Sequence, residues 1–154
     1  MAKVIYFDMD GTVADLYGVD NWLEKLRAFD PSPYIEAKPL VDMAELSKVC
    51  LALINKGYKI GIITWLSKES NQRYDQKVIQ AKFEWWQYYM PYITSYYAIP
   101  YGKPKQQAVS FNEEMWLIDD NAEVREMWNT PKRRKSIDAN GDIIAELWKL
   151  VGNH

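Results

Sequence analysis

The amino-acid sequence predicts an α/β fold in which a mainly parallel sheet is covered by helices in a three-layer arrangement. Short apolar runs typical of buried strands alternate along the chain with longer amphipathic segments typical of helices. Polar residues follow several of these apolar runs directly, as expected where strands deliver functional groups to one edge of a sheet. The length of 154 residues, without a repeat or an interdomain linker, favours one domain over 1–154.

The elements follow from their residues in order. Strands are expected at 3–7, 58–63, 92–99, 115–118 and 135–137, where β-branched and aromatic residues cluster. Helices are expected at 21–29, 39–56, 67–89, from 103 or 104 onward, 121–128 and 142–151. Pro31 and Pro33 are expected to end the first helix, Gly57 to cap the second and Pro91 to stop the third. The segment 13–38 is expected to be a small insertion beside the first strand.

Composition excludes several function classes. Apolar residues make up 48% of the chain and the net charge is −2, so nothing attracts the whole protein to nucleic acid or an anionic membrane. Cys50, the single cysteine, lies in an apolar helical stretch and is expected to be packed, and His154, the single histidine, is the last residue. Cysteine–histidine catalysis and a zinc cluster are therefore not expected. Without a signal-like leader or an apolar run of 18 residues, we expect a cytoplasmic protein with no membrane partner.

The first strand delivers two carboxylates, in Asp8-Met9-Asp10-Gly11-Thr12. Side chains alternate along an extended chain, so Asp8 and Asp10 can converge on one site while Met9 points away. Two acids so close repel each other unless a cation lies between them, and carboxylate oxygens suit Mg²⁺. The alternative is a strand that ends in a capping Asp, followed by an Asp-Gly turn.

Two further strands end in polar residues. Thr64 follows Ile62-Ile63, and Asp119-Asp120 follows Leu117-Ile118. Carboxyl ends of parallel strands share one edge of the sheet, so these groups are expected beside Asp8. Helix capping is the alternative for Thr64 and for Asp120. Neighbouring acids face different directions, and we expect Asp120 in preference to Asp119 to reach a metal.

These groups match the needs of phosphate monoester hydrolysis. Asp8 is expected to be the nucleophile that forms an aspartyl-phosphate, and Asp10 the acid that protonates the leaving oxygen. Mg²⁺ would bind Asp8 and Asp120, with Asp119 and the main-chain carbonyl of Asp10 as further candidate ligands. Thr64 is placed to bond a phosphoryl oxygen. Lys103 is expected to offset the phosphate charge, with Lys105 as a substitute and a solvated surface lysine as the alternative.

In order and context these segments resemble the four motifs of the haloacid dehalogenase-like phosphohydrolases, from Val4 to about Trp128. The resemblance implies a Rossmann-like core, Mg²⁺ dependence and a phosphoaspartate intermediate. The residues expected to bind the substrate are Gly11, Thr12, Thr64, Trp65 and Lys103.

Within that family, residues 8–15 resemble the opening of the 5′(3′)-deoxyribonucleotidases, and residues 117–128 resemble the phosphatase domain of bacteriophage polynucleotide kinase-phosphatases. The chain departs from the nucleotidases in two respects. Trp65 follows Thr64 where those enzymes commonly have a small polar residue, and the insertion at 13–38 is shorter than their helical cap.

The aromatic residues bear on the substrate. A nucleotide base could stack on Tyr17, Trp22, Tyr34 or Trp65, with ordinary packing as the alternative for each. The basic run 132–135 either contacts a polynucleotide or is a solvated loop. The leading hypothesis is a nucleotide phosphatase. The alternatives are a polynucleotide 3′-phosphatase, a small-metabolite phosphatase, a phosphotransferase and a non-catalytic phospholigand-binding protein.

Overall fold

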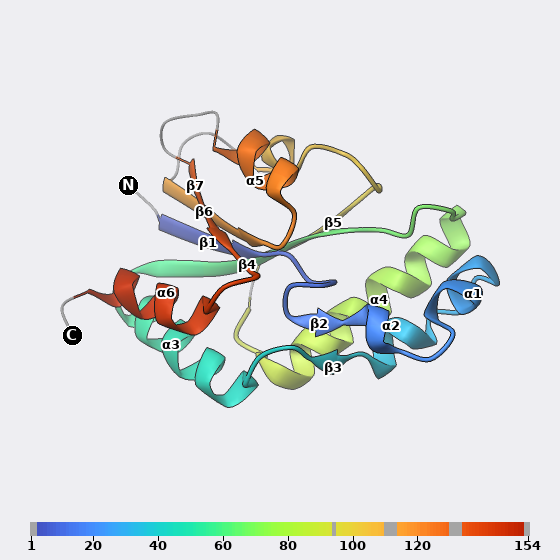
Figure 1. Cartoon of the computed structure of the whole chain (residues 1–154), viewed down its shortest axis with the longest axis horizontal. Helices are drawn as coiled ribbons and strands as arrows, with labels where there is room; N and C mark the ends of the chain where they lie inside the picture. The colour runs from blue at the N-terminus through green and yellow to red at the C-terminus, as the bar shows by residue number, and fades with distance from the viewer. Residues whose placement is uncertain (1–2, 94, 110–113, 130–133, 153–154) are drawn as a thin grey trace.

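A five-stranded parallel sheet forms the centre of the molecule, in the order β5–β4–β1–β6–β7 (Figure 1). The computed structural model describes residues 3–93, 95–109, 114–129 and 134–152. The strands are β1 (Lys3–Phe7), β4 (Tyr58–Trp65), β5 (Ser95–Ile99), β6 (Glu114–Asp119) and β7 (Arg134–Asp138). The chain builds outward from β1 to β5 and then returns to the other side of β1 for β6 and β7. The predicted Rossmann-like α/β fold is confirmed.

Helices cover both faces of the sheet because side chains of the strands alternate between them. Ile5 and Phe7 share one core with α3 (Met43–Asn55), α4 (Gln72–Tyr89) and α6 (Ile143–Val151). Val4 and Tyr6 belong to a second core with Trp128 of α5 (Ala122–Trp128), near the 3₁₀ helix η2 (Lys105–Gln107). Figure 1 shows α3 and α6 below the sheet and α5 above it.

The segment between β1 and α3 forms a small layer of its own. It contains β2 (Ala14–Asp15), the 3₁₀ helix η1 (Leu16–Gly18), α1 (Trp22–Arg27), α2 (Ser32–Glu36) and β3 (Lys38–Pro39). β2 and β3 pair antiparallel and close the segment at its base. Leu16 and Tyr34 pack on Tyr74 and Val78 of α4 in a third apolar cluster. The segment is thereby fixed beside the carboxyl ends of the central strands (Figure 1).

Element boundaries differ from the prediction where caps and prolines act. A helix, α2, begins at Ser32 although Pro31 and Pro33 were expected to break the chain, because proline is tolerated in a first turn that needs no N–H donor. α3 begins at Met43 because the Asp42 side chain caps it. The N–H of Tyr74 donates to the Asn71 side chain, so α4 begins at Gln72.

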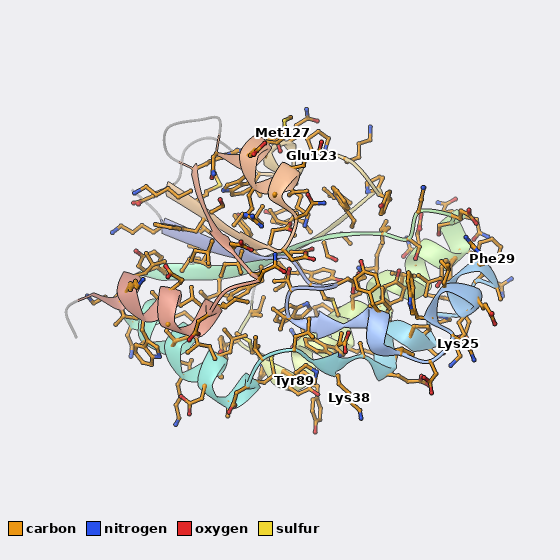
Figure 2. The ribbon with its side chains drawn as sticks, viewed as in Figure 1. Lys25, Phe29, Lys38, Tyr89, Glu123 and Met127 are labelled. Atoms are coloured by element: carbon orange, nitrogen blue, oxygen red, sulfur yellow. The ribbon has the colours of Figure 1, made fainter. Side chains whose placement is uncertain are left out.

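The helices carry polar or exposed residues on their outer faces. On α5, Glu123 and Met127 point away from the sheet (Figure 2), whereas Trp128 is fully buried. Cys50 is fully buried on α3. Within the described residues, no helix is long and apolar enough to cross a bilayer. His154, Lys132 and Arg133 lie outside those residues.

Candidate active site

Asp8, Thr64 and Asp119 lie at the carboxyl ends of three neighbouring strands. The register pairs the last residue of β1 with Ile62 of β4 and with Ile118 of β6. The N–H of Asp8 donates to the carbonyl of Ile118 at 2.9 Å, which extends this ladder into the loop. The local strand patterns and the parallel topology together therefore bring the three residues to one edge of the sheet.

The loop after β1 is held by its own turn and by β6. Met9 is fully buried, and its carbonyl accepts N–H groups from the turn that follows. Gly11 has φ +78°, a conformation that favours glycine, and a Cβ there would lie 2.8 Å from Oδ2 of Asp120, so that side chain would have to shift. Thr12 Oγ1 donates to Asp8 Oδ2 at 2.8 Å and accepts from the N–H of Asp120 at 3.2 Å. The Thr12 side chain thus fixes the acidic loops, whereas it was expected to bind substrate.

Three carboxylates form a tight cluster at this edge. Asp8, Asp119 and Asp120 each offer an oxygen, and these oxygens all lie within 4.8 Å of one another. Asp119 is 1% exposed, and its two oxygens accept bonds from the N–H of Asn121 and from the ammonium of Lys105. Asp120 is less buried and contacts the Thr12 hydroxyl at 3.2 Å. Asp120 is therefore the more open of the two neighbouring acids.

Lys105, rather than Lys103, reaches the acids. Lys105 is 2% exposed, and its Nζ donates to Asp8 Oδ1 at 2.8 Å and to Asp119 Oδ2 at 2.7 Å. Lys103 is exposed, and its carbonyl accepts the indole N–H of Trp65 at 2.9 Å. Burial alone lowers the pKa of Lys105, but Asp8 and Asp119 outweigh it, so the pKa is raised and the ammonium stays charged.

A second buried ammonium comes from α4. Lys82 is fully buried and donates three hydrogen bonds, to Asp10 Oδ2 at 2.8 Å, Thr64 Oγ1 at 2.7 Å and the carbonyl of Trp65 at 2.7 Å. Its Nζ also lies 4.8 Å from the centre of the Tyr34 ring. Thr64 is fully buried under Lys82, so its hydroxyl contacts this ammonium and does not line the cavity described below.

Lys82 was not anticipated from the sequence. A single lysine in a long helix is usually read as a solvated residue. The signal was its position, because Lys82 stands in the stripe formed by the buried residues Tyr74, Val78, Ala81, Trp85 and Trp86. A lysine in that stripe must meet an anion, and the stripe packs toward the edge where Asp10 lies.

Three acids of the site, Asp10, Asp119 and Asp120, have a pKa above that of an ordinary carboxyl group. Burial, and then the neighbouring Asp8, raise the pKa of Asp119 to about 7, although Lys105 opposes the shift. Burial also raises the pKa of Asp120 and of Asp10, against the effect of Lys82 in the case of Asp10. The two lysines therefore do not fully offset the cost of ionising these buried acids.

The donor set suits a hard divalent cation. When all are ionised, the aspartates at 8, 10, 119 and 120 carry two more negative charges than the ammonium groups of Lys82 and Lys105 offset. Every ligand candidate in the cluster is an oxygen, as Mg²⁺ or Ca²⁺ prefers. The cluster of Asp8, Asp119 and Asp120 therefore fits a hard divalent metal ion.

A cavity of about 350 Å³ opens above these acids. Asp8, Asp10 and Lys105 are among its lining residues. Two aromatic pairs line its walls. Tyr17 and Trp22 have ring centres 5.0 Å apart, and Trp65 and Tyr101 have ring centres 5.1 Å apart. Remaining lining residues come mainly from α1 and from the segment after β4, and include Leu23, Leu26, Arg27, Leu66, Lys68 and Glu69.

The four aromatic candidates for base stacking fall into two groups. Tyr17, Trp22 and Trp65 retain surface toward the cavity. Tyr34 also borders it but is 2% exposed, and its hydroxyl bonds Ser67 Oγ at 2.6 Å. Tyr34 therefore serves packing, and the other three remain available to a ligand.

No protein-family model matches the sequence, and no curated protein gives a significant sequence match. Among solved structures, the crystal structure of D,D-heptose 1,7-bisphosphate phosphatase from Burkholderia thailandensis is similar, with a TM-score of 0.54 and 11% sequence identity. The alignment covers 98% of this chain and 99% of that chain. At this identity the likeness shows the fold alone.

Proposed function

We propose that this protein is a Mg²⁺-dependent phosphomonoester hydrolase that acts through an aspartyl-phosphate, with a nucleotide as its substrate. The observation that carries the proposal is the pairing of Asp8 with Lys105 in the lining of a cavity that aromatic residues also line, next to the acids Asp119 and Asp120. The similarity of the fold to a protein described as a phosphatase supports the same reaction class.

Each step uses a group already in position. An oxygen of Asp8 attacks phosphorus, the bond from phosphorus to the leaving oxygen breaks, and a proton passes from Asp10 to that oxygen. Water then attacks phosphorus and gives a proton to Asp10, the bond from phosphorus to the Asp8 oxygen breaks, and inorganic phosphate leaves the regenerated Asp8 carboxylate. The raised pKa of Asp10 supports its role as the acid, and its Oδ1 has no hydrogen-bond partner among the described residues.

Charge on the phosphoryl group is met by Lys105 and by the metal. The ammonium of Lys105 has three protons, and two of them bond Asp8 and Asp119, which leaves one for a phosphoryl oxygen. A Mg²⁺ ion held by Asp8 and Asp120 would neutralise the remaining negative charge and bind a phosphoryl oxygen as a Lewis acid.

The aromatic pairs support a nucleotide rather than a sugar phosphate. Trp65 is held in place by the bond from its indole to the Lys103 carbonyl and by contact with Tyr101, so a planar base meets a fixed ring. Residues 14–39 form a short cap that supplies Tyr17 and Trp22 to the lining of the same cavity. Stacking on one aromatic ring contributes about 1–3 kcal/mol, an interaction that a sugar offers only weakly.

The test is a phosphate-release screen of nucleoside 5′- and 3′-monophosphates, a 3′-phosphorylated oligonucleotide and sugar phosphates, with Mg²⁺ and with EDTA. We expect activity only with metal, none in Asp8→Asn, and the highest kcat/KM for nucleotides. Trp65→Leu should narrow the gap between nucleotides and sugar phosphates about tenfold, equivalent to 1.4 kcal/mol.

The control is Tyr88→Leu, which removes an aromatic ring that is 81% exposed on α4, outside the cavity. Tyr88→Leu should leave the preference for nucleotides over sugar phosphates unchanged. Full turnover in EDTA would refute the metal-dependent mechanism. A wild-type preference for sugar phosphates, or an equal loss on both classes in Trp65→Leu, would refute the nucleotide assignment and leave the phosphatase assignment standing.

A further inference from the structure

Lys82 is a buried charge that the proposed reaction does not yet use. It is fully buried on α4, in a stripe that is otherwise apolar or aromatic. An ammonium costs several kcal/mol to remove from water unless its protons are all bonded. A hydrophobic residue at this position would have completed the core, so the lysine points to a requirement of the site rather than of the fold.

The proton count separates Lys82 from Lys105. An ammonium has three protons. All three protons of Lys82 are used, at 2.7–2.8 Å, by Asp10 Oδ2, Thr64 Oγ1 and the carbonyl of Trp65. None is left for a substrate, and neither Lys82 nor Thr64 lines the cavity. Lys82 therefore acts on the reaction only through the groups it holds.

The two oxygens of Asp10 are in different situations. Oδ2 accepts the bond from Lys82, whereas Oδ1 has no hydrogen-bond partner among the described residues. Asp10 lies on the wall of the cavity, close to Asp8. By holding Oδ2, the ammonium fixes the plane of the carboxyl group, while Oδ1 is buried without a hydrogen-bond partner among the described residues.

Thr64 and the Trp65 carbonyl hold the ammonium in turn. Both come from the end of β4, so the ammonium at the tip of the flexible Lys82 side chain is anchored to the sheet. We propose that Lys82, supported by Thr64, is a positioning residue that orients Asp10 for proton transfer, and that Thr64 serves this lysine instead of binding phosphate. The proposal rests on the proposed phosphatase function.

The proposal predicts an effect that depends on the leaving group. An alkyl alkoxide needs a proton as it leaves, whereas a nitrophenolate does not. Lys82→Met should therefore lower kcat about 100-fold on an alkyl phosphate and less than about tenfold on p-nitrophenyl phosphate, with KM changed less than about threefold. Asp10→Asn should show the same pattern. In the Asp10→Asn background, Lys82→Met should add less than about a threefold loss, because the two residues act as one unit.

Val78→Ala is the matched control, because it opens a cavity in the same buried stripe of α4 without touching the site. It should destabilise the protein and change both substrates by the same factor. A second pair keeps the test decisive if Lys82→Met does not fold. Thr64→Val removes an acceptor of the Lys82 ammonium and should lower kcat more on the alkyl phosphate than on p-nitrophenyl phosphate. Thr64→Ser retains the hydroxyl and should not produce this difference.

The outcomes are distinguishable. An equal loss on both substrates, a large rise in KM, or full additivity with Asp10→Asn would overturn the proposal while wild-type activity persists. If Lys82→Met does not fold, an equal loss of kcat on the alkyl phosphate and on p-nitrophenyl phosphate in Thr64→Val would overturn the proposal. An inactive wild-type protein would instead refute the proposed function on which the inference rests.

Discussion

Replacing Lys105 by methionine tests the centre of the site, because the chain offers a matched control two positions away. Lys105 is 2% exposed and bonds Asp8 and Asp119 at 2.8 and 2.7 Å, whereas Lys103 is exposed. Methionine keeps the length of the side chain and removes the charge. Lys105→Met therefore leaves two buried acids without their counter-ion, and Lys103→Met removes a solvated charge.

The structure sets the size of the effect on stability. Removing one partner of a buried ion pair costs about 3–5 kcal/mol. We expect the lower end, about 3 kcal/mol, because Asp119 already has a pKa of about 7 and takes up a proton when the ammonium is lost. For a chain of this size that loss corresponds to a fall in Tm of about 6–12 °C. Lys103→Met should stay within about 0.5 kcal/mol of wild type.

Activity should separate the two variants further. Loss of a charged donor to a phosphoryl oxygen lowers kcat by about 10²–10³, and Lys105→Met should show a loss of that order, measured by phosphate release. Lys103→Met should stay within about twofold. Thermal denaturation by circular dichroism in EDTA gives the stability term and confirms that both variants are folded at the assay temperature. Equal losses in the two variants, or a larger loss in Lys103→Met, would refute the assignment of Lys105.

Two more predictions follow from the charges of the structure. Because burial raises the pKa of Asp119 to about 7, well above its unfolded value, the metal-free protein should lose stability as pH rises from 5 to 7. In urea unfolding, the free energy of unfolding of the wild type should fall by about 2 kcal/mol more than that of Asp119→Asn over this range, and added Mg²⁺ should reduce this fall. Equal pH dependence of stability in the two proteins would contradict the raised pKa of Asp119. Arg134→Met should cost about 2–4 kcal/mol, because its buried guanidinium donates to the carbonyl of Gln106 within η2 and to that of Val109 just after it. The exposed neighbour Lys135→Met should cost less than about 1 kcal/mol in the same thermal assay, and a comparable cost would remove Arg134 as the support of that loop.

The positions of the acids were predictable from the sequence because two patterns along the chain were enough to place them at one edge of the sheet. Apolar runs before Asp8 and Asp119 indicated buried strands, and the alternation of strands and helices implied a parallel sheet that gathers their carboxyl ends. Thr64 was placed at the right edge by the same reasoning, but its hydroxyl lies under Lys82. Which way a side chain turns at the end of a strand depends on what packs beneath it, and local pattern does not contain that.

The lysines were less predictable because they come from long-range contacts. Lys105 begins η2 and turns inward to Asp8, whereas Lys103 lies in the preceding loop, where its carbonyl accepts a bond from the Trp65 indole. That bond joins residues 38 positions apart and leaves no trace in the local sequence. The helix that begins at Ser32 was missed because a local signal was misread. Prolines usually end a helix, but here they stand at its N-terminal end, where they are tolerated.

The site also links catalysis to the order in which the chain folds. Lys82 bonds Asp10 across 72 positions, and Lys105 bonds Asp8 across 97, so the loop after β1 receives its counter-ions from two remote parts of the chain. Contacts at such sequence separation require long loops to close, as does the pairing of β1 with β6. A chain in which the two ion pairs have not formed has no competent site. We expect local opening that lifts α4 from the sheet to abolish activity while the five strands remain paired.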